Sequence, residues 1–488
     1  FQKNQQIYKE GQMAVANKKN DLIALADRLK NFTQNKGKMP FVPNEIRLDT
    51  IVYNNINKTN FALVKARTNI QSGQVYTKEE LIEGINGAMG TTIFSQISFE
   101  TFTTHGKLGL QLNGFERSRH QLKGSLHYDD FHGVGILANY TGRNILGAAS
   151  RTLVTLDIAE QPRMRIQHQK NFGEDRDWWW RTEAYGQRLT QNVQVNGRIE
   201  NDIRYRFFEF DNQLNRNIKP MTSYAGINLN YQNTHLKPKI DPETELNNAK
   251  LRSYNYNVIQ LGAHFVSNTL NTTTFATAGR VFKANVSRSL NNTIRVDFSD
   301  PSVSNEKGSL SNYTKFGFEY EKRFPLANQL TSILGASGNF TVVDKEGNDK
   351  ISFDNLGIGA KYGLGGSQPN PRRDVFVLPG LNEGELSVTQ FTKLNAGLQY
   401  NFKSKLYVTP HVDLAVVGFS SLKDYVNHVI PAKGQWQDFK EVGFLLSSGI
   451  TLGYDSVLGP VTFDVSWVND VDKIRLFFGV GFQLNRSN

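Results

Sequence analysis

From about residue 114 to the C-terminus, apolar and polar residues alternate with a period of two. Five apolar positions in the last segment alternate with two glycines and two cations, namely Ile474, Leu476, Phe478, Val480 and Phe482 against Lys473 and Arg475. This period indicates β-strands with one apolar and one polar face. We count about sixteen such segments over roughly 370 residues, and an even number of antiparallel strands can close without an exposed edge.

Two features favour lipid, rather than a second sheet, as the neighbour of the apolar face. Many segments have about ten residues or more, the length that a tilted strand needs to cross a bilayer. Aromatic residues also gather at segment ends, as in Trp178-Trp179-Trp180 and Phe207-Phe208, where a membrane-interface girdle would place them. The pattern therefore predicts a mainly β fold, with a transmembrane antiparallel β-barrel over residues 114–488.

Residues 43–113 have a different pattern, which predicts a small α+β domain ahead of the barrel. The expected order is strand, helix, helix, strand, strand: Glu45–Tyr53, Thr59–Thr68, Thr77–Met89, Ile93–Phe102 and Lys107–Asn113. The second helix begins with a capping-box pattern, in which Thr77 is followed three residues later by Glu80.

Residues 1–42 are expected to be a helical tail followed by a linker. Asp21 can cap a helix whose apolar face is formed by Leu22, Leu25, Ala26 and Leu29. A lone helix of this length is marginal in water, so we expect it to be the tail of an upstream domain, with a linker helix as the alternative. The sequence starts at a Phe and shows no signal peptide, so the chain is expected to begin inside a longer precursor.

Composition narrows the classes of function. The chain has no cysteine, which excludes disulfides, thiol catalysis and cysteine-ligated metals. The net charge is +11, but Lys and Arg are spread along the chain without a nucleic-acid motif, so nucleic acid is not an expected partner. A basic lumen, or loops that face anionic lipid head groups, accounts for the charge more simply.

Two segments resemble a known superfamily. The stretch from Ile70 to Tyr76, then Glu79-Glu80-Leu81, Gly90, Ile93 and Phe94, resembles a POTRA domain, the periplasmic module that precedes barrels of the BamA and TamA (bacterial surface antigen) superfamily. The stretch from Gly459 to Asp464 resembles the penultimate-strand signature of these barrels. The resemblance implies the outer membrane of a Gram-negative bacterium, with residues 43–113 in the periplasm.

Within this superfamily, patatin-like outer-membrane proteins are the most similar in organisation: a lipase domain, one POTRA domain, then the barrel. This implies that the chain anchors and presents a patatin-like (phospho)lipase domain upstream of it. A non-enzymatic translocator or insertase for proteins is the alternative, and a passive pore is disfavoured because simple porins need no POTRA domain. Outer-membrane lipids are the implied partners, and the sequence leaves a homodimer open.

The stretch from Phe376 to Leu386 resembles the superfamily's loop that folds back into the barrel lumen. The resemblance makes Gly380, Leu381 and Glu385 the candidates for contacts inside the lumen. Elsewhere in the superfamily this loop carries an Arg-Gly-Phe/Tyr motif. Here Pro379 stands where the Arg would be, which leaves the usual contact between that Arg and the wall open.

No catalytic, metal or cofactor site is expected in this chain. Acyl hydrolysis by a patatin domain needs a Gly-x-Ser-x-Gly elbow, which does not occur, so whether the parent protein is a serine hydrolase stays open. If it is, its catalytic residues precede Phe1. No two His residues have metal-ligand spacing. Asp464, Lys473 and Arg475 are candidates for a charged luminal network, and the alternative is simple solvation of wall charges.

Overall fold

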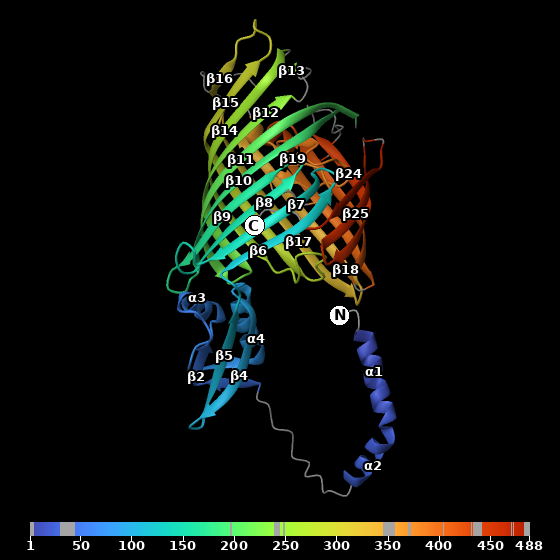
Figure 1. The fold of residues 1–488 in the computed structure, drawn as a ribbon. Coiled ribbons are helices and arrows are strands. Elements are labelled where there is room, and N and C mark those ends of the chain that lie inside the picture. The colour runs from blue at the N-terminus through green and yellow to red at the C-terminus, as the bar shows by residue number, and fades with distance from the viewer. Residues whose placement is uncertain are drawn as a thin grey trace.

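The computed structural model describes residues 4–29, 44–195, 198–238, 245–246, 249–344, 357–368, 372–403, 405–430, 432, 442–469, 471 and 473–482. Figure 1 shows a long barrel with a small α+β domain at one end and two helices that precede this domain in the chain. No helix among these residues is long and apolar enough to span a membrane.

The N-terminal helices are α1 (Asn4–Asn17) and α2 (Lys19–Leu29), in the segment where the sequence predicts helix. Helix α2 begins before the predicted cap, and Asp21 lies in its first turn, where a carboxylate interacts favourably with the helix dipole. The apolar side chains of Leu22, Leu25 and Leu29 are 48%, 49% and 52% exposed. The apolar face predicted from the sequence is therefore uncovered.

The α+β domain contains seven elements: β1 (Glu45–Leu48), β2 (Thr50–Asn54), α3 (Lys58–Thr68), β3 (Gln74–Thr77), α4 (Lys78–Gly90), β4 (Phe94–Thr104) and β5 (Lys107–Glu116). Strand β5 pairs with β2 in parallel and with β4 in antiparallel fashion. The predicted strands and helices follow one another in the predicted sequence, with the short β3 added between the two helices, and the capping box of Thr77 and Glu80 is present.

The first predicted strand differs in one respect, since it is divided at Asp49 into β1 and β2. Strand β1 pairs with the short β3, which the sequence did not predict, whereas β2 joins the main sheet. One segment thus serves two sheets. Leu48, at the end of β1, is fully buried with Ile70 and Leu110 in the core of the domain.

Sixteen long antiparallel strands of the described chain close into a barrel, which confirms the predicted fold class. They are β6 (His120–Asp129), β7 (Gly133–Arg143), β8 (Ser150–Ala159), β9 (Arg163–Phe172), β10 (Trp178–Val195), β11 (Arg198–Lys219), β12 (Ser223–Pro238), β14 (Ala249–Asn268), β15 (Gly279–Phe298), β17 (Tyr313–Ala327), β18 (Leu330–Val343), β22 (Gln390–Lys403), β23 (Leu406–Gly418), β24 (Gly443–Ser456), β25 (Gly459–Val468) and β26 (Arg475–Val480). The short strands β13 (Glu245–Leu246) and β16 (Glu306–Ser309) extend the wall beside β14 and β15, and helix α5 (Leu422–His428) follows β23.

Burial in the wall is the inverse of that in a soluble protein. In β9, Arg163 and Arg165 are buried, whereas Met164 and Ile166, which alternate with them, are 43% and 42% exposed. Exposed apolar side chains alternating with buried charges are stable only when the outer surface meets lipid and the inner surface meets a polar lumen.

The α+β domain contacts the turns at one end of the barrel. Arg67 of α3 donates a hydrogen bond of 2.8 Å to the carbonyl oxygen of Arg176 and lies 3.4 Å from the carboxylate of Asp177, both in the β9–β10 turn. Burial lowers the pKa of Arg67, and the charge of Asp177 acts against this change. Asn144, in the β7–β8 turn, donates a hydrogen bond of 2.7 Å to Asn60 of α3. These contacts fix which rim of the barrel faces the domain.

Candidate functional site

The lumen contains the described part of the long segment between β18 and β22, residues 344, 357–368 and 372–389, which we call the luminal loop. It contains a 3-10 turn, η1 (Ile358–Ala360), and three short strands, β19 (Tyr362–Leu364), β20 (Val375–Phe376) and β21 (Leu386–Val388). Strand β19 lies between the other two, parallel to β20 and antiparallel to β21.

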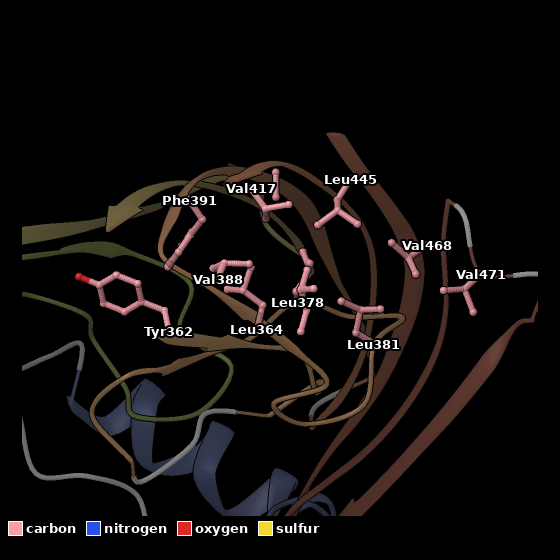
Figure 2. Packing of buried hydrophobic residues seen from close by; sticks show 12 residues of the cluster. Tyr362, Leu364, Leu378, Leu381, Val388, Phe391, Val417, Leu445, Val468 and Val471 are labelled. Atoms are coloured by element: carbon pink, nitrogen blue, oxygen red, sulfur yellow. The ribbon is translucent and has the colours of Figure 1, made fainter. Parts of the chain in front are cut away.

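An apolar cluster attaches the luminal loop to the wall (Figure 2). From the loop, Leu378 and Leu381 are fully buried, and they pack in one cluster with Val417 of β23, Leu445 of β24 and Val468 of β25. Each buried leucine side chain stabilises the packed state by about 1.5–3 kcal/mol relative to the exposed one. The loop is thus held by a hydrophobic core of its own rather than suspended in water.

Gly380 lies at a close approach of the loop to the wall. Its φ angle is +90°, and a Cβ atom at this position would be 3.0 Å from the carbonyl carbon of Trp467 and from the nitrogen of Val468. Both the backbone conformation and the tight space therefore favour glycine. The sequence placed Gly380 and Leu381 as candidates in the lumen, and the structure brings both against β25.

Glu385 and Arg475, predicted separately as a loop residue and a wall charge, form an ion pair. Nη2 of Arg475 lies 3.0 Å from Oε1 of Glu385, and the second guanidinium nitrogen contacts Oε2. Their side chains are 1% and 10% exposed for Glu385 and Arg475. The carboxylate belongs to the loop and the guanidinium to the wall, while Pro379 accepts a hydrogen bond from Ser447 through its carbonyl oxygen.

Further ion pairs join Arg373 and Asp374 of the loop to other parts of the wall, and Arg373 also lies 3.3 Å from Glu209 of β11. Asp374 lies 2.9 Å from Nζ of Lys315 in β17, and Arg373 lies 3.2 Å from Asp211 in β11. Because β11, β17 and β26 are distant from one another in the barrel order, the loop is anchored at separate points around the lumen. Sequence reasoning missed Arg373 and Asp374, although their position in a charged stretch ahead of the predicted loop was a signal.

The remaining two predicted wall charges lie apart from the loop's ion pairs. Asp464, on β25, accepts a hydrogen bond of 2.6 Å from Thr451 and lies 2.9 Å from Nε2 of His411. Lys473 precedes β26 and is exposed, and no ion pair of Lys473 is found among the described residues. The structure therefore brings Asp464 into a polar wall cluster and leaves Lys473 in solvent.

The barrel closes between its first and last strands, β6 and β26, through a short ladder that we call the seam. Over the described residues the seam has two register pairs, Asp129 with Gly479 and Tyr128 with Val480. On its other side, β6 pairs with β7 over ten positions. A side-chain contact adds to the seam, since the carboxylate of Asp130 accepts a hydrogen bond from the backbone nitrogen of Phe478. Among the described residues, the seam is thus the shortest ladder between two neighbouring long strands of the wall, and few backbone hydrogen bonds of this part hold it closed.

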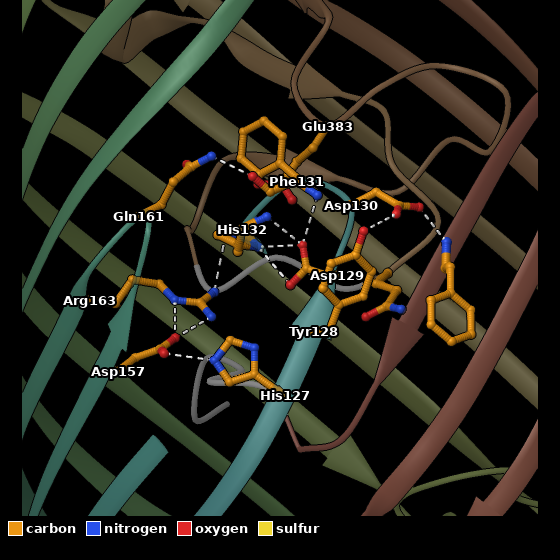
Figure 3. Close-up of polar contacts among 12 residues, drawn as sticks. His127, Tyr128, Asp129, Asp130, Phe131, His132, Asp157, Gln161, Arg163 and Glu383 are labelled. Carbon is orange, nitrogen blue, oxygen red and sulfur yellow. Dashed lines mark hydrogen bonds and ion pairs between the residues drawn. The ribbon is translucent and has the colours of Figure 1, made fainter. Parts of the chain in front are cut away.

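A polar network fixes the end of β6 beside the seam (Figure 3). His132, in the β6–β7 turn, lies 2.9 Å from the carboxylate of Asp129 and 3.3 Å from Arg163. The carboxylate of Asp157 accepts from Nε of Arg163 at 2.7 Å and contacts Nε2 of His127 at 2.7 Å. The network links β6 to β8 and β9, so the first strand stays attached to that side of the wall. These residues come from three strands, and no local sequence pattern identified them together.

Among the residues that the structure describes, no group of three or more His, Cys, Asp or Glu side chains is arranged to hold a metal ion. The luminal loop occupies the lumen, and the short seam faces the lipid.

Comparisons with known proteins agree with this architecture. The crystal structure of BamA from Haemophilus ducreyi lacking POTRA domains 1–3 is similar, with a TM-score of 0.56, 15% identity, and coverage of 89% of this chain and 84% of that chain. CdiB from Escherichia coli has a TM-score of 0.50 and 12% identity, and the match covers 89% of this chain and 75% of that one. At these identities the likeness concerns the fold. No curated protein matches the sequence.

A sequence model described as the OMP85 superfamily matches residues 107–484, which is most of the chain. This match agrees with the closed barrel and with the loop inside it. The chain therefore belongs to the OMP85 superfamily and is a β-barrel of the bacterial outer membrane.

Proposed function

We propose that this chain anchors and presents a periplasmic patatin-like (phospho)lipase domain that precedes it in a longer protein. The observation that carries the proposal is the uncovered apolar face of α2, where Leu22, Leu25 and Leu29 are each about half exposed. A short helix with such a face is marginal in water and needs a partner surface. A folded domain ahead of α1 and α2 would supply that surface.

The filled lumen is consistent with an anchoring role. The luminal loop contributes a buried apolar cluster and is tied by ion pairs to β11, β17 and β26. We expect a barrel occupied in this way to anchor the protein in the membrane without conducting solutes. The proposed role makes no use of an open channel.

We propose in addition that residues 45–116 form a POTRA domain in the periplasm. The order of its elements and the parallel pairing of β2 with β5 support this assignment. The similarity to BamA covers 89% of the chain, which is more than the barrel strands alone. This domain would set the distance and orientation of the lipase domain relative to the inner leaflet.

Labelling of the native protein with a fluorophosphonate probe tests the lipase proposal. Such probes react with the activated serine of serine hydrolases. We expect the native protein from outer membranes to be labelled at a Ser within a Gly-x-Ser-x-Gly peptide that this chain lacks. Absence of labelling, in a sample where another serine hydrolase is labelled, would contradict the proposal.

The seam favours a second candidate, a protein translocator or insertase without an enzyme domain. Two register pairs close β6 against β26, so a client strand could pair with either edge after few backbone hydrogen bonds are broken. An exposed strand edge is a ready template for such pairing.

A disulfide across the seam separates the two candidates. The chain has no cysteine, so the double variant Tyr128→Cys with Val480→Cys would introduce a single pair at facing positions. An insertase should lose client insertion after oxidation and regain it after reduction. An anchor should keep its full hydrolytic activity on soluble ester substrates in both states. A variant pair on β6 and β7, Lys123→Cys with Asn139→Cys, is the matched control.

A further inference from the structure

A cavity of about 240 Å³ lies between the α+β domain and the rim of the barrel. Helix α3 contributes Arg67 to its lining, and the barrel contributes Arg143 of β7 and Arg151 of β8. None of the lining residues is acidic. The cavity is therefore strongly cationic, although it is not part of the luminal loop or of the seam.

The two barrel arginines lie directly opposite each other in the wall. Arg143 and Arg151 are register partners in the β7–β8 ladder, and Arg151 faces Gln169 on its other side. Like charges at facing positions of neighbouring antiparallel strands repel each other. Among the described residues, neither arginine makes an ion pair with a carboxylate. An anion in the cavity would relieve this repulsion.

Arg143 also has an unused donor. Its side chain is only 9% exposed; Nη2 donates to the hydroxyl of Thr92 at 3.3 Å, while Nη1 is buried and has no partner in the described part of the chain. Leaving a charged donor buried and unpaired is costly. By contrast, Arg67 is occupied by Asp177 and by the carbonyl of Arg176. The arginine side chains that can still bind an anion in the cavity are thus Arg143 and Arg151.

The position of the cavity relates it to the membrane interface. Trp179 lines the cavity and is buried, whereas its neighbours Trp178 and Trp180 are 40% and 41% exposed on the opposite face of β10. Exposed tryptophans gather at the level of lipid head groups. The cavity is therefore at the same height along the barrel as the head groups of one leaflet.

We propose that this cavity binds the phosphate group of an anionic ligand, held by Arg143 and Arg151. Guanidinium groups match the oxygen atoms of phosphate in pairs, and two of them facing one space suit a phosphate monoester or diester. The ligand is either the head group of a phospholipid or a free phosphate ester. This site goes beyond the proposed anchoring function and does not depend on it.

Calorimetric titration of the full chain in dodecyl maltoside, a detergent without phosphate, tests the site. Sodium phosphate and glycerol 3-phosphate are the probes. We expect saturable binding to the wild type and an affinity weaker by about tenfold or more in Arg143→Gln and Arg151→Gln. Arg151→Lys should retain binding, because lysine still offers a point charge to phosphate. Arg216→Gln, at an exposed position of the same rim, is the matched control and should bind like the wild type.

Native mass spectrometry identifies the source of the phosphate. The full chain is released from nanodiscs of phosphatidylethanolamine and phosphatidylglycerol. A lipid that stays on the wild type and is lost from Arg151→Gln assigns the site to a head group. Binding of the soluble probes without a retained lipid assigns it to a free anion. If no arm shows binding to the wild type, or if Arg151→Gln binds as well as the wild type, the proposal is wrong.

Discussion

At the residue scale, the attachment of the luminal loop depends on a buried ion pair in which the loop supplies the carboxylate and the wall supplies the guanidinium. Glu385 of the loop meets Arg475 of β26, while Pro379 occupies the position where the superfamily resemblance would place an arginine. The sequence predicted both charged residues as luminal candidates. Their pairing could not be predicted, because a separation of 90 residues is bridged only by the closed barrel.

Replacing Arg475 by Gln is expected to weaken the attachment of the loop. Removing one partner of a buried pair leaves the other charge uncompensated, at a cost of about 3 kcal/mol. Thermal unfolding followed by the shift in gel mobility should show a lower midpoint for Arg475→Gln. Lys473→Gln, which changes an exposed cation two residues earlier, should leave the midpoint unchanged. Equal midpoints for both variants would refute a stabilising role for the pair.

Replacing Gly380 by Ala tests the close approach of the loop to β25. The positive φ angle strains any residue with a Cβ atom, and at 3.0 Å from Trp467 and Val468 a methyl group would fit only if these neighbours moved slightly. We expect a destabilisation of about 1–3 kcal/mol, measured by denaturant unfolding. Gly124→Ala in β6 is the control, because the nearest atom to its added Cβ would be 3.9 Å away. A Gly380→Ala variant as stable as this control would contradict the described contact.

At the element scale, local patterns predicted most of what the structure contains. Alternation predicted the wall strands, and the capping box of Thr77 and Glu80 predicted the start of α4. The break between β1 and β2 was missed because it follows from pairing with β3, a distant partner, rather than from the residues around Asp49. The seam was missed for the same reason, because its length depends on the pairing of β6 with β26, two strands at opposite ends of the barrel sequence.

The luminal loop as an element is expected to block conduction. Replacing residues 366–384 by a short Gly-Ser linker removes most of its anchored part. Planar-bilayer recordings should then show a stable conductance that is several times that of the intact barrel, because water replaces the packed loop. Shortening the turn at residues 300–305, between β15 and β16, is the control and should not change conductance. If the intact barrel conducts as well as the variant with residues 366–384 replaced, the loop does not occlude the lumen.

At the scale of the whole molecule, the fold class followed from the sequence because a barrel wall repeats one rule sixteen times. The alternating pattern of the strands does not predict the contacts between the barrel and the α+β domain. The cavity of Arg143 and Arg151 forms only where the α+β domain meets the barrel rim, and neither pattern alone indicated it. The role of α2 likewise depends on a contact with another part of the protein, because nothing in the described chain covers its apolar face.

The intact mass of the native protein from outer membranes, with mapping of its N-terminal peptides, tests the central proposal most directly. We predict a mass that exceeds 55.1 kDa by about 30 kDa, the size of one further domain, together with a Gly-x-Ser-x-Gly peptide. A mature protein that begins at or near Phe1 would contradict the lipase anchor and leave a translocator or insertase with a single small periplasmic domain as the better account.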